Sequence, residues 1–353
     1  MSDPLLIYGA TGHSGRLLAR QACALGLRPI LCGRSRSAVE ALGAELGLEH
    51  RTTSVSDRDA LDSALSGVRV VLNAAGPFSK TAEPILDTCI QRGVHYLDIT
   101  GELAVVERLA RRHGAARDRD LMVMPCVGFD VVPTDCLAAH VAGRIRRARH
   151  LFIAVTNLQM MTRGTAKTML EAAEHGVVLR DGSIERVPLG SISRDFDFGD
   201  GPRAAMGVSL ADTVTAYYTT GVPNVETYAE ATPLLRGMLT SSAAFSWLTR
   251  TAPAQACLHA LIDALPVSPI AGDFRANGSG GQTIVAEADD GRGNRARARL
   301  RTPEAYAFTA VTGATIAAAV LNGDLEPGFQ TPARVYGSDF VLTLPGVTRE
   351  DLE

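Results

Sequence analysis

Residues 5–15 decide the fold: they read Leu5-Leu6-Ile7-Tyr8-Gly9-Ala10-Thr11-Gly12-His13-Ser14-Gly15. The first four are apolar or aromatic, which is typical of a buried strand. Three glycines then allow a tight turn. Apolar residues recur beyond it on one face of a predicted helix, at Leu17, Leu18, Ala22 and Leu25. A strand, a glycine-rich turn and an amphipathic helix in this order predict the first unit of a parallel α/β sheet.

The same alternation continues to about residue 130. Strands are predicted at 5–8, 29–32, 50–55, 68–74, 94–99 and 121–126. Helices are predicted between them, including 81–93, 102–119 and a short helix from Asp57 to Gly67. The predicted fold class is therefore α/β, with a Rossmann-type doubly wound parallel sheet.

Beyond residue 130 the pattern changes to longer strands, which are predicted at 151–156, 213–218, 225–231, 283–288 and 295–301. Residues 289–294, Asp-Asp-Gly-Arg-Gly-Asn, predict a hairpin turn between the last two. A helix is expected over 233–265, interrupted at Pro253. The uncharged stretch 305–323 contains many alanines and threonines, which favours a packed interior helix over a membrane span.

These patterns predict three parts of the chain. Residues 1–130 form the Rossmann domain, and residues 131–324 form a second, mixed α+β domain for substrate binding and dimerisation. Residues 325–353 form a C-terminal segment that packs back on the first domain, with a helix starting at Thr331-Pro332.

Composition favours a small-molecule partner. Of the 353 residues, 46% are hydrophobic and 21% charged, and the net charge of −3 gives no overall field that would attract nucleic acid. The six cysteines form no CxxC pair and the eight histidines no HExxH motif, so no metal site is predicted. The start of the chain does not have the pattern of a signal peptide, and we expect a cytoplasmic protein without a transmembrane segment.

The glycine loop predicts a dinucleotide site. Glycine lets the backbone approach a pyrophosphate closely, and the free amides at the start of the next helix face its charge. A plain tight turn between strand and helix is the alternative. The residues expected to bind the cofactor here are Gly9, Thr11, Gly12, His13, Ser14 and Gly15, although His13 could equally be a solvated loop residue.

The end of the second predicted strand indicates which dinucleotide is bound. An acidic residue there would bind an unmodified ribose, whereas a cation would bind a 2′-phosphate. The chain has Arg34 followed by Ser35, and a guanidinium pairs with a phosphate through two hydrogen bonds. We therefore predict NADP rather than NAD. The alternative is a solvated surface arginine.

Two further loops follow predicted strands at the same edge of the sheet. Asp57 could accept a hydrogen bond from the adenine amino group, or it could cap its own helix. The small residues of Asn73-Ala74-Ala75-Gly76 would let the backbone approach the nicotinamide ribose.

With these motifs in place, the sequence resembles the saccharopine dehydrogenase-like oxidoreductases, which include trans-acting enoyl reductases. The matching stretches are 8–12, 32–35, 72–78, 96–102 and 128–135, with 163–165, 218–224 and 330–333 in the second domain. The resemblance implies a nucleotide-binding domain followed by a substrate domain, and hydride delivery to a C=N or conjugated C=C bond. Residues 162–165 and 209–212 depart from the family pattern, and both departures could reshape the substrate pocket.

Another class of glycine-loop enzyme is excluded. Short-chain dehydrogenases use a tyrosine and a lysine four residues later. None of the seven tyrosines has such a partner, and the chain contains only Lys80 and Lys167. A different proton source is therefore required.

The catalytic candidates are Tyr96, Asp130 and Lys167. Tyr96 and Asp98 alternate on a predicted strand and so share a face, but Tyr96 could be a core aromatic residue. Asp130 lies where the chain leaves the first domain, and it could either transfer a proton or hold the turn. Lys167 could instead be an exposed helix residue.

The predicted function is that of an NADPH-dependent reductase acting on an imine or an activated alkene. The alternative is a catalytically inactive protein that senses NADP. A small-molecule substrate is expected, and the apolar stretch 234–248 would suit either a hydrophobic substrate or the contact of a homodimer.

Overall fold

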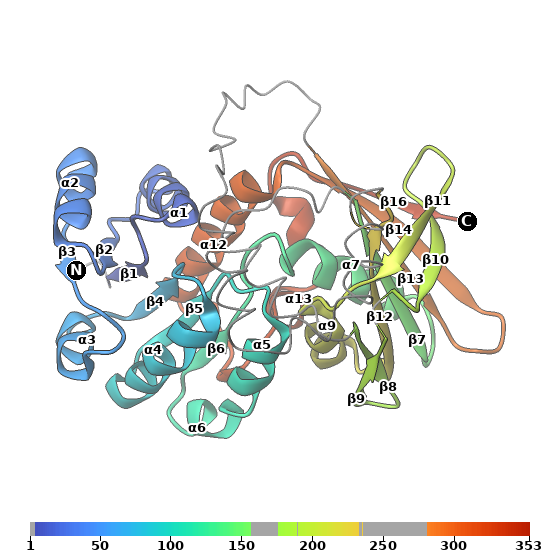
Figure 1. Ribbon diagram of the computed structural model, residues 1–353, viewed down its shortest axis with the longest axis horizontal. Coiled ribbons are helices and arrows are strands. Elements are labelled where there is room, and N and C mark those ends of the chain that lie inside the picture. Colours follow the sequence, from blue (N-terminus) through green and yellow to red (C-terminus); the bar gives the residue numbers. More distant parts are fainter. Residues whose placement is uncertain (1–3, 157–175, 189, 233–234, 236–280) are drawn as a thin grey trace, which may run out of the picture.

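The computed structural model describes residues 4–156, 176–188, 190–232, 235 and 281–353. They form two sheets, each packed against helices (Figure 1). Sheet A is seven-stranded and parallel, in the order β15-β6-β5-β4-β1-β2-β3. Its strands are β1 (Leu5–Tyr8), β2 (Ile30–Gly33), β3 (His50–Thr52), β4 (Val70–Asn73), β5 (His95–Asp98), β6 (Met122–Met124) and β15 (Gly328–Phe329). This order confirms the predicted Rossmann-type fold class.

Alternate residues of β1 enter different cores. Leu6 and Tyr8 face the side covered by α3, α4 and α5, whereas Leu5 and Ile7 face the side covered by α1, α2 and α12. Both faces of the strand are buried, which explains its unbroken apolar sequence. The helices are α1 (His13–Ala24), α2 (Arg36–Leu46), α3 (Arg58–Ala64), α4 (Phe78–Arg92), α5 (Leu103–Ala110), α6 (His113–Arg117) and α12 (Ala305–Leu321).

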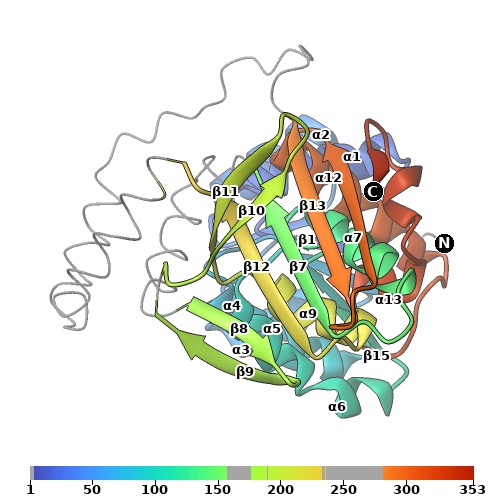
Figure 2. The same ribbon diagram turned by 90° about the vertical axis from the view of Figure 1, so that its right-hand side faces the viewer.

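Sheet B is mixed and has nine strands, in the order β10-β11-β12-β7-β13-β14-β16. In addition, β8 pairs with β12, and β9 pairs with β8 (Figure 2). The β7–β12 pair is parallel and the other pairs are antiparallel. The strands are β7 (His150–Val155), β8 (Gly176–Arg180), β9 (Ser183–Val187), β10 (Ser193–Asp197), β11 (Pro202–Gly207), β12 (Asn224–Glu230), β13 (Gln282–Asp289), β14 (Arg295–Thr302) and β16 (Thr348–Leu352).

Two helices cover one face of sheet B. They are α7 (Val132–Gly143), which crosses from the first sheet to the second, and α9 (Asp212–Thr220). The predicted hairpin at 289–294 is confirmed, because it joins β13 to β14.

The strand prediction for Thr213–Tyr218 is wrong, because these residues lie in α9. Their β-branched and aromatic side chains favour a strand. The helix forms because its N-terminal half is buried against the rest of the protein, and Gly221 ends it in a left-handed conformation with φ 70°. The single helix predicted at 102–119 is likewise divided into α5 and α6. The helix predicted at 233–265 lies almost entirely outside the described residues.

The predicted interior helix at 305–323 is confirmed as α12, which packs against α1. A methyl group added at Gly313 would stand 2.7 Å from Leu18 Cδ2, so the two helices are in close contact. Among the described residues, no helix combines the length and the apolar character needed to cross a bilayer.

The end of the chain contacts both sheets. β15 pairs with β6 in sheet A, and β16 pairs with β14 in sheet B. Between them, α13 (Pro332–Tyr336) starts directly after Thr331, as predicted, and is followed by the 3₁₀ helix Phe340–Thr343.

Candidate cofactor site

The glycine loop between β1 and α1 is closely packed. Gly9 has φ +82°, a conformation that favours glycine, and a Cβ there would lie 2.8 Å from the amide nitrogen of Ala75. A Cβ on Gly15 would lie 2.2 Å from the carbonyl oxygen of Gly9. Neither position has room for a side chain, so both glycines are required by the turn.

The start of α1 is open to an anion. Gly12 is the N-cap residue of α1 and supplies no side-chain hydrogen bond, and Ser35 likewise makes none as the N-cap residue of α2. In contrast, Asp57 caps α3 by accepting the N–H of Ala60 at 3.0 Å, and Glu102 occupies the start of α4. α1 and α2 are the helices at whose starts the sequence predicts the diphosphate and the 2′-phosphate, and neither start is closed by a side-chain cap. This arrangement fits the predicted dinucleotide.

The other predicted residues of this loop surround the helix start. Thr11 accepts the Nε–H of Arg16 through its carbonyl oxygen at 3.1 Å. His13 is exposed, and its ring lies edge-on to that of Tyr306, with 5.0 Å between ring centres. Ser14 is half-buried in the first turn of α1.

Arg34 and Ser35 directly follow β2 and are both exposed. Within the described part of the chain, Arg34 forms no ion pair, so its guanidinium is available for a ligand. Asp57 is exposed as well, and its capping bond to Ala60 shows the structural role that the sequence allowed. Its contact with adenine stays a prediction.

The loop 73–76 is held by buried polar groups. Asn73 is completely buried, and its Oδ1 accepts the N–H of Ala75 at 3.0 Å. Thr81 donates to the carbonyl oxygen of Ala75 at 2.6 Å. Ala74 and Ala75 are half-buried and Gly76 is exposed, so the small residues form the accessible edge of the loop beside Gly9.

Tyr96 lies beneath this loop and is completely buried. Its hydroxyl donates to Asp98 Oδ2 at 2.8 Å and accepts from Asn73 Nδ2 at 3.3 Å, so the two strand residues do share a face. Burial raises the pKa of Tyr96 well above its usual value and that of Asp98 to about 6. The hydroxyl is thus enclosed in a network that supports the loop.

Asp130, in contrast, is exposed. It follows β6 and immediately precedes α7, and its Oδ2 lies 2.7 Å from the position that a Cβ on Gly101 would occupy. The surrounding protein excludes enough water to raise the pKa of Asp130 to about 6. Of the three predicted catalytic residues, Asp130 is the one with both solvent access and a raised pKa, as far as the described residues extend.

Lys167 lies outside the described residues, as do residues 163–165 of the second-domain motifs and almost all of the apolar stretch 234–248. No geometry is assigned to them.

No role is predicted from the sequence for two further carboxyl groups, which lie near the point where the chain passes from sheet A to sheet B. Asp135 in α7 and Asp212 in α9 are both buried, and burial raises their pKa values to about 7 and about 8. Thr134 contacts Asp212 Oδ1, whereas Asp212 Oδ2 is buried without a hydrogen-bond partner among the described residues. Asp135 is the last residue of the family-like stretch 128–135, but no sequence signal showed that it would be buried.

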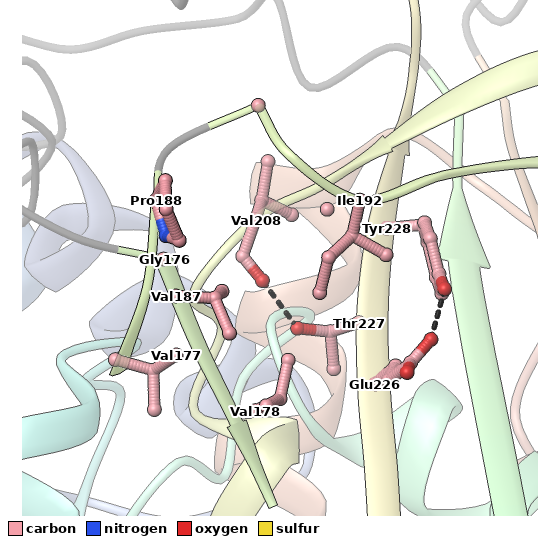
Figure 3. Close-up of a pocket in the computed structure, with 12 residues that line it drawn as sticks. Gly176, Val177, Val178, Val187, Pro188, Ile192, Val208, Glu226, Thr227 and Tyr228 are labelled. Carbon is pink, nitrogen blue, oxygen red and sulfur yellow. Dashed lines mark hydrogen bonds between the residues drawn. The ribbon is translucent and has the colours of Figure 1, made fainter. Parts of the chain in front are cut away.

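A small pocket in sheet B has too little free volume for a substrate. It is lined by residues of β8, β9, β11 and β12, among them Val178, Val208 and Thr227 (Figure 3). Its free volume of about 10 Å³ accommodates no more than one water molecule.

The fold and the site define a nucleotide-binding α/β protein with a Rossmann-type first domain. Residues 5–124 match the family described as Saccharopine dehydrogenase NADP binding domain. The resemblance stated from the motifs and the predicted cofactor NADP are both confirmed by this match.

Two curated relatives are similar to part of the chain. A trans-acting enoyl reductase of Mycobacterium tuberculosis is 30% identical over 139 residues, which are 37% of this chain and 33% of that protein. A protein of the same name from Mycobacterium ulcerans is 28% identical over 162 residues, which are 44% of this chain and 39% of that protein. The matched region therefore spans between a third and two fifths of these relatives.

One solved structure is similar over the whole length. Saccharopine dehydrogenase (L-Glu forming) from Saccharomyces cerevisiae has a TM-score of 0.64 and 12% sequence identity, with 99% of this chain and 100% of that chain covered. At this identity the match shows the shared fold, including the second domain.

Proposed function

We propose that this protein is an NADPH-dependent reductase that delivers hydride to a C=N or an activated C=C bond of a small molecule. The observation that carries the proposal is the uncapped start of α1 behind Gly9 and Gly15, with the exposed Arg34 at the end of the neighbouring strand. The names of the curated relatives favour an alkene substrate, and an imine is the alternative that the family resemblance implies.

In this proposal the first domain binds the dinucleotide along the carboxyl edge of sheet A. The amides of Ser14 and Gly15 face the diphosphate, and Arg34 with Ser35 binds the 2′-phosphate. The small residues 74–76 allow the nicotinamide ribose to approach the backbone. NADPH supplies the hydride when it is bound, and the protein provides orientation and a proton.

The proton is assigned to Asp130. Desolvation raises the pKa of Asp130 to about 6, so a fraction of this carboxyl group is protonated near neutral pH, and the residue lies at the surface, where it can regain a proton that it has given up. Tyr96 is enclosed, and its assigned role is to support the loop 73–76. Lys167 stays a catalytic candidate from its place in the sequence alone.

The partner assignments complete the proposal. A substrate with an apolar part, a homodimer and a cytoplasmic location remain the expectations drawn from the composition and the apolar stretch 234–248. Size-exclusion chromatography with light scattering would measure the subunit number.

Stopped-flow absorbance of the reduced nicotinamide tests the function directly. The purified protein is mixed with NADPH and a panel of imines and enals, and oxidation of NADPH by at least one class is expected. Stereospecific transfer of deuterium from labelled NADPH to the product would establish hydride transfer. Tight NADPH binding without oxidation across the panel would instead favour the NADP-sensing protein.

A further inference from the structure

Glu102 connects two loops at the carboxyl edge of sheet A. It occupies the N-cap position of α5 but does not cap that helix. Its side chain crosses to the start of α4 instead, where Oε1 accepts the N–H of Phe78 at 2.8 Å and Oε2 accepts the N–H of Ser79 at 2.8 Å. Both carboxylate oxygens therefore accept hydrogen bonds from the backbone just beyond the loop 73–76 and Pro77.

The loop is held from three directions. At its start, Asn73 and Thr81 bond the amide and the carbonyl of Ala75. On one flank, Gly9 approaches so closely that a Cβ there would lie 2.8 Å from the amide nitrogen of Ala75. Glu102 provides the third attachment, at the far end of the loop. The backbone between these attachments has little freedom to move.

Glu102 is itself fixed relative to β5. Its N–H donates to Thr100 Oγ1 at 3.0 Å, and the N–H of Thr100 donates to Asp98 Oδ1 at 2.9 Å. Asp98 also accepts the N–H of Cys126 at 3.0 Å, which links this chain of contacts to the end of β6. The position of the loop that follows β4 is thereby tied to the ends of β5 and β6.

We propose that Glu102 is a positioning residue for the nicotinamide half of NADPH. This inference rests on the proposed function, because it takes residues 74–76 of the loop 73–76 as the surface that the nicotinamide ribose contacts. The carboxylate acts through Phe78 and Ser79 and touches neither cofactor nor substrate. The adenine half is assigned to α1 and α2, on the other side of β4 in the sheet order, and so should not depend on Glu102.

Two ligands separate the halves of the cofactor in the test. Calorimetry measures the affinity of the Glu102→Gln variant for NADPH and for 2′,5′-ADP, which has the 2′-phosphate but no nicotinamide. We expect NADPH to bind about fivefold more weakly, as the loss of one cap-type bond implies, and 2′,5′-ADP to bind as it does to the wild type. Glutamine keeps the shape of the side chain, so the variant should fold even if Glu102→Ala does not.

Asp290→Asn is the matched control. Asp290 Oδ1 also accepts two backbone amides, those of Arg292 at 2.8 Å and Asn294 at 3.1 Å, but in the β13–β14 hairpin. The Asp290→Asn variant should bind NADPH and 2′,5′-ADP with the same affinities as the wild type.

Three outcomes would count against the inference. Wild-type affinity for NADPH in Glu102→Gln would overturn it and leave the proposed function standing. An equal loss for both ligands would show a general structural effect and would also overturn it. A wild-type protein that binds neither ligand would refute the proposed function together with the inference.

Discussion

The carboxylate of Asp130 lies directly against Gly101: a methyl group added at Gly101 would stand 2.7 Å from Asp130 Oδ2. The backbone of Gly101 is not in the left-handed region, so a larger residue there would act by pushing the end of the Asp130 side chain aside. The contact couples the loop after β5 to the residue that we propose as the proton donor.

Gly101→Ala is therefore expected to displace Asp130 and to lower kcat by about 10- to 100-fold, because small displacements of a reacting group are costly. NADPH affinity should change much less. Steady-state kinetics and calorimetry measure the two effects. Gly114→Ala is the matched control, since a Cβ there meets nothing within 4 Å, and unchanged kcat in Gly101→Ala would contradict the assignment of Asp130.

Arg34→Asp should weaken NADPH binding far more than NADH binding. The charge-assisted contact with the 2′-phosphate is worth about 1.5–3 kcal/mol, and the substituted carboxylate also repels the phosphate. Titration of both cofactors tests this, with the exposed Arg292→Asp as the control for a general change in charge. An equal loss for the two cofactors would refute the 2′-phosphate assignment.

Tyr96→Phe is expected to affect stability more than chemistry. Removing the hydroxyl leaves Asp98 Oδ2 without this donor in a buried position, which costs about 1–3 kcal/mol of unfolding free energy. Denaturant unfolding measures the loss. If kcat fell by about 100-fold or more with stability unchanged, Tyr96 would be the proton donor after all.

Stability should decrease as the pH rises from about 4 to about 8. Burial raises the pKa of Asp135 to about 7 and that of Asp212 to about 8, so the folded state binds more protons than the unfolded state across this range. Their stabilising contribution is complete below the pKa of the unfolded chain and is lost as the pH passes the folded pKa.

Melting temperatures at about pH 5 and about pH 8.5 measure this dependence. Asp212→Asn should reduce the difference between them, because asparagine does not titrate. Asp290→Asn serves as the control, since the pKa of Asp290 is lowered by its hydrogen bonds and shifts stability in the opposite direction at acidic pH. A wild-type melting temperature that rises steadily over this range would contradict the prediction.

The sequence was sufficient for the six strands β1 to β6 of sheet A, which were each found from a local signal, but it did not predict β15 (Gly328–Phe329), which joins the sheet from near the end of the chain. Leu5–Tyr8 is apolar throughout since both its faces are buried, and the glycine loop and the next helix follow directly. It failed at Thr213–Tyr218, where side-chain propensity favoured a strand but burial against other elements and the glycine at 221 produced a helix.

The site was predictable only in part, for a related reason. Arg34 and the glycines could be found from their neighbours in the chain. The surroundings of Asp135 could not be found in this way. Asp135 accepts hydrogen bonds from Thr219 and from the amide of Ala333, which are 84 and 198 residues away in the sequence. No local pattern predicts that three such separate motifs meet at one carboxylate.

The contact between Gly313 and Leu18 limits how this protein could exchange parts with its relatives. A chimera that received only residues 1–130 from a relative would pack that relative's α1 against the α12 of this protein. The space there is small, because one methyl group added at Gly313 would lie 2.7 Å from Leu18 Cδ2. A working exchange would have to transfer residues 305–321 with the first segment. Helix α12 and the nucleotide-binding sheet are thus expected to have diverged together.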